Sequence, residues 1–170
     1  DYWSTLAALR DEGKVAHIGV SNHDVEQLER AESITHVESL QPPFSAIERG
    51  CAADVIPWCH EHGTGVIVYS PMRNGLLTGR MTRERIANLP AEDFRRRNPH
   101  FQEPLLSRNL AYAELLGRVG ARYGRSAGEM AIAWTLRLPG TVSIPKATSA
   151  EHVREVAAAR DLRLDAADVA

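Results

Sequence analysis

The chain has 170 residues, of which 44% are hydrophobic and 25% are charged, and its formal net charge at pH 7 is -2. This length and composition are typical of a soluble globular domain with a sizeable core. The small net charge gives no electrostatic reason to expect a nucleic-acid or membrane partner, and no apolar run approaches the roughly 18 residues of a transmembrane helix.

Helical and strand patterns alternate through the first part of the chain. Trp3, Leu6 and Leu9 recur at helical spacing ahead of Gly13, a residue type that commonly ends helices. The expected elements are a helix over 2–12, a strand over 15–20, a helix capped by Ser21-x-x-Asp24, a weaker strand over 37–41, a helix over 51–62, and a strand over 66–69 that is apolar throughout, as in the interior of a parallel sheet.

A long polar segment, 80–104, follows the strand at 66–69. Loops of this length inside a compact domain are usually functional or mobile. The elements after it are a helix over 105–122, a helix that begins at the capping box Ser126-x-x-Glu129, a strand over 141–145, and a helix over 150–160 capped by Thr148-x-x-Glu151.

Strand followed by helix, repeated along the chain, predicts an α/β fold with a parallel sheet and helices outside it. Right-handed crossovers allow either an open doubly wound sheet or an arc of a barrel. No Gly-x-Gly-x-x-Gly follows a predicted strand, which counts against a Rossmann domain and favours the barrel. In both folds, ligands lie beyond the carboxyl ends of the strands.

The start of the chain and its two cysteines indicate in which cellular compartment we expect the protein. No signal peptide is visible, and the chain starts at Asp1 without a methionine, so we expect a natural N-terminus further upstream. Cys51 and Cys59 fall on one predicted helix, about 12 Å apart at 1.5 Å per residue, which exceeds the reach of a disulfide. We therefore expect reduced thiols in a cytoplasmic protein.

Polar or aromatic residues stand at the end of each predicted strand: Ser21-Asn22, Gln41, Tyr69-Ser70-Pro71-Met72 and Pro145-Lys146. Each has a simpler explanation: Ser21 as a helix cap, Gln41 as a polar strand terminus, Tyr69 as a rim aromatic and Lys146 as a solvated cation. Their joint occurrence at one end of one sheet favours a ligand site.

Four motifs together resemble the aldo-keto reductase superfamily: Gly13-Lys14-Val15-x-x-Ile18-Gly19-Val20-Ser21-Asn22, Gln41-Pro42-Pro43-Phe44-Ser45, Tyr69-Ser70-Pro71-Met72-x-x-Gly75-Leu76-Leu77-Thr78-Gly79 and Ile144-Pro145-Lys146. The resemblance covers nearly the whole chain. It implies a parallel (β/α)8 TIM barrel of which residues 1–170 form the C-terminal, cofactor-binding half, with strands five to eight present and the N-terminal catalytic half absent.

The resemblance also implies a nicotinamide dinucleotide as cofactor and a role for each matching position. Ser21, Asn22 and Gln41 would bind the nicotinamide carboxamide, and Tyr69 would stack on its ring. Ser70, Pro71, Met72, Arg73, Asn74 and Arg80 would hold the pyrophosphate, with Asp93-Phe94-Arg95 as the clasp of the following loop. Lys146, Thr148, His152 and Glu155 would hold the adenosine end. Lys146 favours NADP, because a lysine there suits a 2′-phosphate. NAD stays possible, because His152 and Val156 stand where the family often has arginine and asparagine.

By resemblance, the complete protein is an NADP-dependent oxidoreductase that reduces small aldehydes and ketones to alcohols. The family's catalytic aspartate, tyrosine, lysine and histidine come from the first half of the barrel, and Tyr2, Tyr112 and Tyr123 lie on predicted outer helices instead. General acid catalysis needs the donor within about 3 Å of the substrate, so we expect no catalytic residue here and no activity from this chain alone. An open half-barrel is also expected to self-associate.

Two other functions stay open at the level of sequence. One is a non-catalytic nicotinamide-binding subunit of the kind found on ion channels, which shares these motifs. The weaker one is a barrel lyase or isomerase that acts on phosphate substrates through Lys146. A metal site at His60-Glu61-His62 is not expected, because residues two apart face different sides of a helix.

Overall fold

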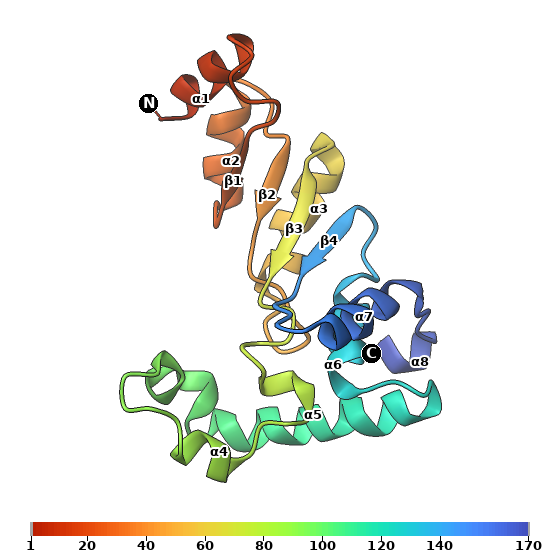
Figure 1. Cartoon of the computed structure of the whole chain (residues 1–170). Helices are drawn as coiled ribbons and strands as arrows, with labels where there is room; N and C mark the ends of the chain where they lie inside the picture. Colours follow the sequence, from red (N-terminus) through yellow and green to blue (C-terminus); the bar gives the residue numbers. More distant parts are fainter. Residues whose placement is uncertain (1, 170) are drawn as a thin grey trace.

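A computed structural model describes residues 2–169. Its described residues form a four-stranded parallel sheet in the order β1 (Gly19–Ser21), β2 (Ser39–Gln41), β3 (Gly65–Tyr69) and β4 (Thr141–Ile144), which run side by side in Figure 1. The predicted parallel α/β arrangement is confirmed. The first two strands are shorter than the predicted 15–20 and 37–41, because only their last residues pair with a neighbouring strand.

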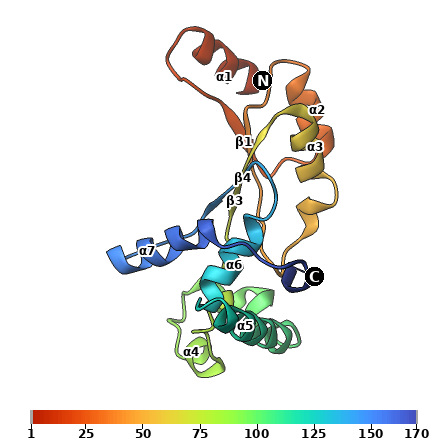
Figure 2. The ribbon, with the colours of Figure 1, turned by 90° about the vertical axis from the view of Figure 1, so that its right-hand side faces the viewer.

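Two helices, α2 (Val25–Glu32) and α3 (Val55–His62), lie along one face of the sheet, as Figure 2 shows. Alternate strand residues point into this layer. Val20, Leu40 and Val66 are buried there in one core cluster with side chains of both helices, including Leu28 and Ile56. This burial removes apolar surface from water and fixes the sheet against the helices.

The opposite face of the sheet is open. Ile67 pairs in register with Val142 and Tyr69 with Ile144, so these side chains share the face that also carries the exposed Ser21. Val142 and Ile144 keep 56% and 44% of their surface exposed. Within residues 2–169, no helix covers these two side chains of β4.

A second layer of helices lies beyond the carboxyl ends of the strands (Figure 1). The long helix α5 (Leu105–Arg122) has the predicted bounds and packs against α6 (Ala127–Thr135), of which every residue is buried. Helix α7 (Ala150–Ala158) follows β4. The remaining elements are α1 (Tyr2–Asp11), α4 (Arg83–Ala87), α8 (Ala166–Val169) and the 3-10 turns η1 (Gly50–Ala52), η2 (Leu76–Thr78), η3 (Phe94–Arg97), η4 (Pro99–Phe101) and η5 (Ala159–Asp161).

Of the three predicted N-terminal helix caps, two are formed by a different residue nearby and one is formed by the predicted residue. Helix α2 is capped by Asp24 with Gln27 in a reciprocal capping box, while Ser21 is the last residue of β1. Ser149, not Thr148, caps α7 by accepting a hydrogen bond from the backbone of His152. The predicted box of Ser126 and Glu129 at the start of α6 is present. In each wrong case another capping residue stood nearby, and tertiary structure selected it.

The predicted helix 51–62 is divided. Cys51 lies in η1 and Cys59 in α3, and Asp54 caps the new helix start between them. Both thiols are free, and burial raises the pKa of each to about 11. The segment 80–104, predicted to be a loop, contains the short elements α4, η3 and η4.

Candidate functional site

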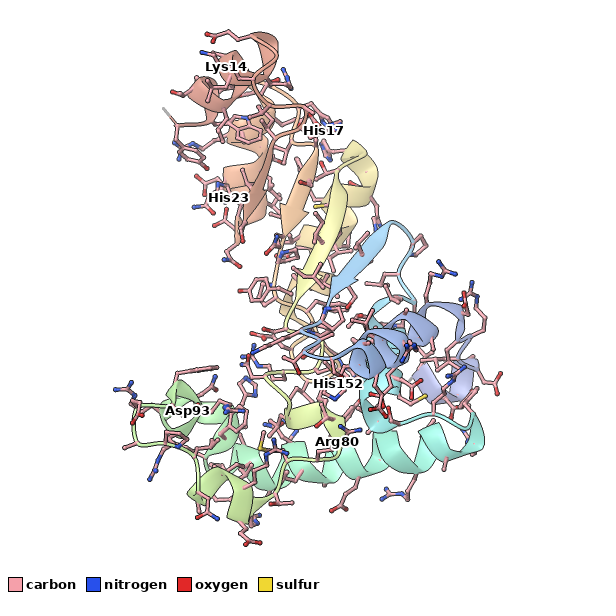
Figure 3. The ribbon with its side chains drawn as sticks, in the orientation of Figure 1. Lys14, His17, His23, Arg80, Asp93 and His152 are labelled. Atoms are coloured by element: carbon pink, nitrogen blue, oxygen red, sulfur yellow. The ribbon has the colours of Figure 1, made fainter. Side chains whose placement is uncertain are left out.

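A cavity of about 710 Å3 opens beyond the carboxyl ends of β3 and β4. Its walls are the loop after β3, the N-terminal turn of α6, and the segment from the end of β4 through α7. In Figure 3, Arg80 and His152 lie close together on this side of the molecule, far from Lys14 and His17. The predicted site residues that line the cavity are Tyr69, Ser70, Pro71, Met72, Asn74, Arg80, Arg95, Lys146, Thr148, His152 and Glu155.

The loop after β3 turns sharply because several of its residues adopt left-handed backbone conformations. Ser70, Arg73 and Asn74 have φ values of 56°, 45° and 56°, and Gly75 follows at 91°. Non-glycine residues take this conformation at a cost. The loop therefore stays close to the strand end instead of continuing the direction of β3.

Of the predicted pyrophosphate residues in this loop, Arg73 does not line the cavity. Its guanidinium forms an ion pair with Glu48, which lies in the loop after β2. The charge of Arg73 is therefore engaged by Glu48 rather than offered to the cavity.

The wall formed by α7 is polar. Thr148 Oγ1 lies 3.3 Å from His152 Nδ1, and Ser149 caps the helix start beside them. Glu155 Oε1 lies 3.8 Å from Arg80 Nη2, so α7 and the loop after β3 form an ion pair across the cavity. Lys146 is exposed and has no carboxylate partner among residues 2–169.

The lining carries more cations than anions. Arg80, Arg85, Arg95 and Lys146 contribute guanidinium or ammonium groups, whereas Glu129 and Glu155 are the lining carboxylates. Glu129 is additionally paired with Arg125 at 3.1 Å. A concave site with excess positive charge and backbone donors suits a phosphate-bearing ligand.

The predicted clasp is an internal ion pair. Both carboxylate oxygens of Asp93 accept hydrogen bonds from the guanidinium of Arg95, at 2.9 and 2.6 Å. This side-chain hydrogen bond lowers the pKa of Asp93 to about 2. Phe94 between them lines the cavity and keeps 55% of its surface exposed. The pair thus fixes the turn that presents an aromatic ring at the cavity mouth.

Ser21, Asn22 and Gln41 are brought together with Tyr69, but outside the cavity. Ser21 Oγ donates a hydrogen bond to the backbone oxygen of Gln41 at 2.8 Å. Tyr69 OH donates to Asn22 Oδ1 at 3.0 Å. These contacts join the ends of β1, β2 and β3 into one polar edge that is continuous with the cavity through Tyr69.

Sequence reasoning missed the wall contributed by α6. Gly128 approaches the loop so closely that an added Cβ would lie 3.4 Å from Met72 Sδ. The capping box marked the start of this helix but not the surface it faces, which depends on residues far away in sequence. The lining residues to which the sequence assigned no ligand contact are Gly75, Thr78, Arg85, Ser126, Gly128, Glu129, Ile132, Ile144, Pro145 and Val156, together with Phe94, which was predicted only as part of the clasp.

Metal ligation and membrane insertion can both be judged from residues 2–169. No three His, Cys, Asp or Glu side chains of this range gather closely enough to ligate a metal ion. None of its helices combines the length and apolar content that crossing a membrane requires.

Comparisons with known proteins agree on one family. The model of the "Aldo/keto reductase family" matches residues 1–170. Aldo-keto reductase YhdN of Bacillus subtilis is 33% identical over 136 residues, which are 79% of this chain and 40% of the relative. The NADH-specific methylglyoxal reductase of Escherichia coli is 31% identical over 166 residues, 97% of this chain and 50% of that protein.

Solved structures extend the likeness to the fold. A glycerol dehydrogenase from Gluconobacter oxydans superposes with a TM-score of 0.90 at 27% identity, over 98% of this chain and 50% of the other. An aldo-keto reductase from Klebsiella pneumoniae in complex with NADPH gives 0.68 at 27% identity, over 96% and 49%. The chain thus spans between 40% and 50% of the length of these similar proteins.

Proposed function

This chain belongs to the aldo/keto reductase family, and on that premise we propose that it supplies the nicotinamide dinucleotide site of an oxidoreductase that reduces aldehydes or ketones to alcohols. The observation that carries the proposal is the cavity beyond β3 and β4, whose lining combines an aromatic ring, a sharply turned loop and excess positive charge. Its volume of about 710 Å3 lies within the usual range of about 300–1,000 Å3 for ligand pockets.

The residues present fit the cofactor at both ends. Tyr69 offers a ring face for nicotinamide, and Ser21, Asn22 and Gln41 offer the donors and acceptors that a carboxamide needs. The bound dinucleotide would supply the hydride. The side chains at this end would orient the ring and fix which of its faces meets the substrate.

For the pyrophosphate, we assign the loop 70–74, through the backbone N–H groups of Met72 and Asn74 that are free within the described chain, and the guanidinium of Arg80. Cationic groups and backbone N–H donors are the usual partners of phosphate oxygens. The clasp of Asp93 and Arg95 would hold the covering segment in place.

Lys146, Thr148, His152 and Glu155 would hold the adenosine end. Lys146 is exposed without a carboxylate partner among the described residues, so it is available to a 2′-phosphate. We therefore propose NADP as the preferred cofactor. One similar protein is named as NADH-specific and another is described in complex with NADPH, so both cofactors occur among the similar proteins.

We further propose that the chain is the C-terminal half of a (β/α)8 barrel, in agreement with its coverage of the similar proteins. The half that completes the barrel would bring the acid–base residues and cover the open face of the sheet. This chain alone would then be inactive. The named relatives are reductases, which lends no support to a non-catalytic channel subunit or to a phosphate lyase.

Calorimetric titration of NADPH and NADH into the complete protein tests the proposal. We expect one dinucleotide per polypeptide, together with aldehyde-dependent loss of the reduced-nicotinamide absorbance. The 170-residue chain assayed alone should show no turnover. Absence of dinucleotide binding by the complete protein would overturn the function, and turnover by the isolated chain would overturn the half-barrel assignment.

A further inference from the structure

Arg73 lies in the loop proposed to hold the pyrophosphate, yet its side chain is directed away from the cavity. Its guanidinium pairs with the carboxylate of Glu48, and the two side chains keep only 15% and 31% of their surface exposed. Arg73 Nε is buried without a hydrogen-bond partner within residues 2–169. A partly desolvated ion pair of this kind is costly to form, so we expect it to have a compensating role in this loop.

The backbone conformation at Arg73 indicates what this role is. Arg73 and Asn74 are consecutive left-handed residues, with φ of 45° and 56°. Arg73 N–H donates to Ser70 at 2.9 Å and Arg73 C=O accepts from Leu76 at 3.0 Å. The N–H groups of Met72 and Asn74, on either side, have no hydrogen-bond partner in the described chain. Left-handed turns of this kind leave backbone N–H groups free for an anion, at a conformational cost that surrounding contacts must offset.

The backbone on which Glu48 lies is closed by local hydrogen bonds. The backbones of Ser45 and Glu48 exchange two hydrogen bonds, at 3.0 and 3.1 Å, in the loop after β2. His100 of η4 also lies within electrostatic range of both Arg73 and Glu48. Asn109 of α5 donates a hydrogen bond to the backbone oxygen of His100 at 3.0 Å. Segments that are far apart in sequence thus converge behind the loop after β3.

We propose that the Glu48–Arg73 pair is a positioning device: it holds the left-handed turn so that the free N–H groups beside Arg73 meet the phosphates, and Arg73 makes no direct phosphate contact. The inference rests on the proposed function. It assigns an indirect role to Glu48, which no motif marks, and changes the role of Arg73 from ligand to support. Because the pair acts on the loop backbone, it affects cofactor binding rather than hydride transfer.

The two roles of Arg73 predict opposite results for Glu48→Gln. If Arg73 bound phosphate directly, freeing its guanidinium would leave NADPH affinity unchanged or raise it. If the pair positions the loop, Glu48→Gln and Arg73→Met each weaken NADPH binding roughly tenfold, the value of one or two misaligned hydrogen bonds. The double variant should then lose no more than either single variant, because both remove the same interaction.

The measurement is calorimetric titration of NADPH into the complete protein and each variant, after thermal unfolding has verified that each is folded. Arg83→Met is the matched control, because Arg83 also pairs with a glutamate, Glu103, but neither residue lines the cavity. In turnover assays the KM for NADPH should rise while kcat at saturation stays near that of the unsubstituted protein. Arg73→Lys, which keeps the charge, should recover part of the affinity.

Glu48→Asp extends the test to a variant that leaves no unpaired buried charge and should therefore fold. We expect an intermediate loss of affinity, because the shorter carboxylate pulls the turn out of place. Unchanged affinity in Glu48→Asp and Glu48→Gln, or additive losses in the double variant, would overturn the proposal. Failure of the unsubstituted protein to bind dinucleotide would instead overturn the proposed function.

Discussion

The two halves of the sheet differ in how much of a site this chain builds beyond them. Past β3 and β4, the turned loop, α6 and α7 form the walls of a cavity, and Arg80 and Glu155 form an ion pair across it. Past β1 and β2, Ser21 and Asn22 are exposed, and their side chains form hydrogen bonds with Gln41 and Tyr69. The proposed phosphate and adenosine end is thus walled by this chain, whereas the proposed nicotinamide end has one wall.

This difference follows from the lengths of chain between the strands. Only residues 42–64 separate β2 from β3, and they contain η1 and α3, which returns along the outer face. Residues 70–140 separate β3 from β4 and contain α5 and α6. The longer connection places α5 and α6 beyond the carboxyl ends of the strands, as Figure 1 shows.

The largest expected effect concerns the open face and edges of the sheet. At about 25 cal/mol per Å2, leaving roughly 800 Å2 of apolar surface uncovered forgoes about 20 kcal/mol. This exceeds the net stability of about 5–15 kcal/mol typical of a domain. We therefore expect the isolated 170-residue chain to self-associate or to be molten, as measured by sedimentation velocity and thermal unfolding.

Substitutions can locate that association on the open face. Ile144→Lys places a charge on the exposed edge strand β4 and should reduce the assembled fraction. Ile34→Lys is the control, because Ile34 is similarly exposed, at 46%, but follows α2 away from the sheet edges. A compact monomer that unfolds cooperatively would show that this chain closes its own core and would contradict the proposed half-barrel.

At the proposed nicotinamide end, Gln41→Ala in the complete enzyme should lower turnover by about 10²-fold, because a reacting ring displaced by about 1 Å loses its orientation. Affinity for adenosine fragments of the cofactor should stay the same, as calorimetry can test. Gln27→Ala provides the control, since Gln27 only caps α2. Weaker cofactor binding with normal turnover would show that Gln41 does not position the nicotinamide ring.

At the enclosed end, Lys146→Ala should remove most of the preference for NADPH over NADH. One charge-assisted hydrogen bond to the 2′-phosphate is worth roughly 1.5–3 kcal/mol, or about 10- to 150-fold in the ratio of dissociation constants. Lys14→Ala is the control, because Lys14 lies at the opposite end of the molecule (Figure 3). Equal affinities for both cofactors before substitution would contradict the assignment.

The sequence predicted the parallel sheet and the bounds of α5 because these depend on local patterns of apolar residues. Eleven of the fifteen residues that the family resemblance assigned to the cofactor line the cavity. The strand ends and the glycine-bearing loop among them are also local signals, whereas Arg95, His152 and Glu155 were assigned through the resemblance alone. The choice of Asp24 over Ser21 and of Ser149 over Thr148 as caps was not predictable in this way. Neighbouring residues with similar capping ability are separated only by tertiary contacts.

The direction of the Arg73 side chain illustrates the same limit at the site. Its place within a phosphate-binding motif favoured contact with the ligand, but its partner Glu48 lies in another loop. The wall formed by α6 was missed for the same reason. Contacts between segments distant in sequence determine both the direction of the Arg73 side chain and the position of α6. A single sequence contains no local signal for such contacts.

The smallest expected effect concerns pH at the enclosed end. Burial and the charge of Arg73 hold the pKa of His100 below its ordinary value of 6.5, and Glu48 acts in the opposite direction. The folded protein therefore binds a proton at His100 less readily than the unfolded chain, so this residue lowers stability as pH falls below about 6.5. By NMR titration, Arg73→Met should raise the pKa of His100 and Glu48→Gln should lower it, while Arg83→Met leaves it unchanged. Shifts of the same sign in the Arg73 and Glu48 variants would mean that His100 responds to a general rearrangement of the loop rather than to the two charges of the pair.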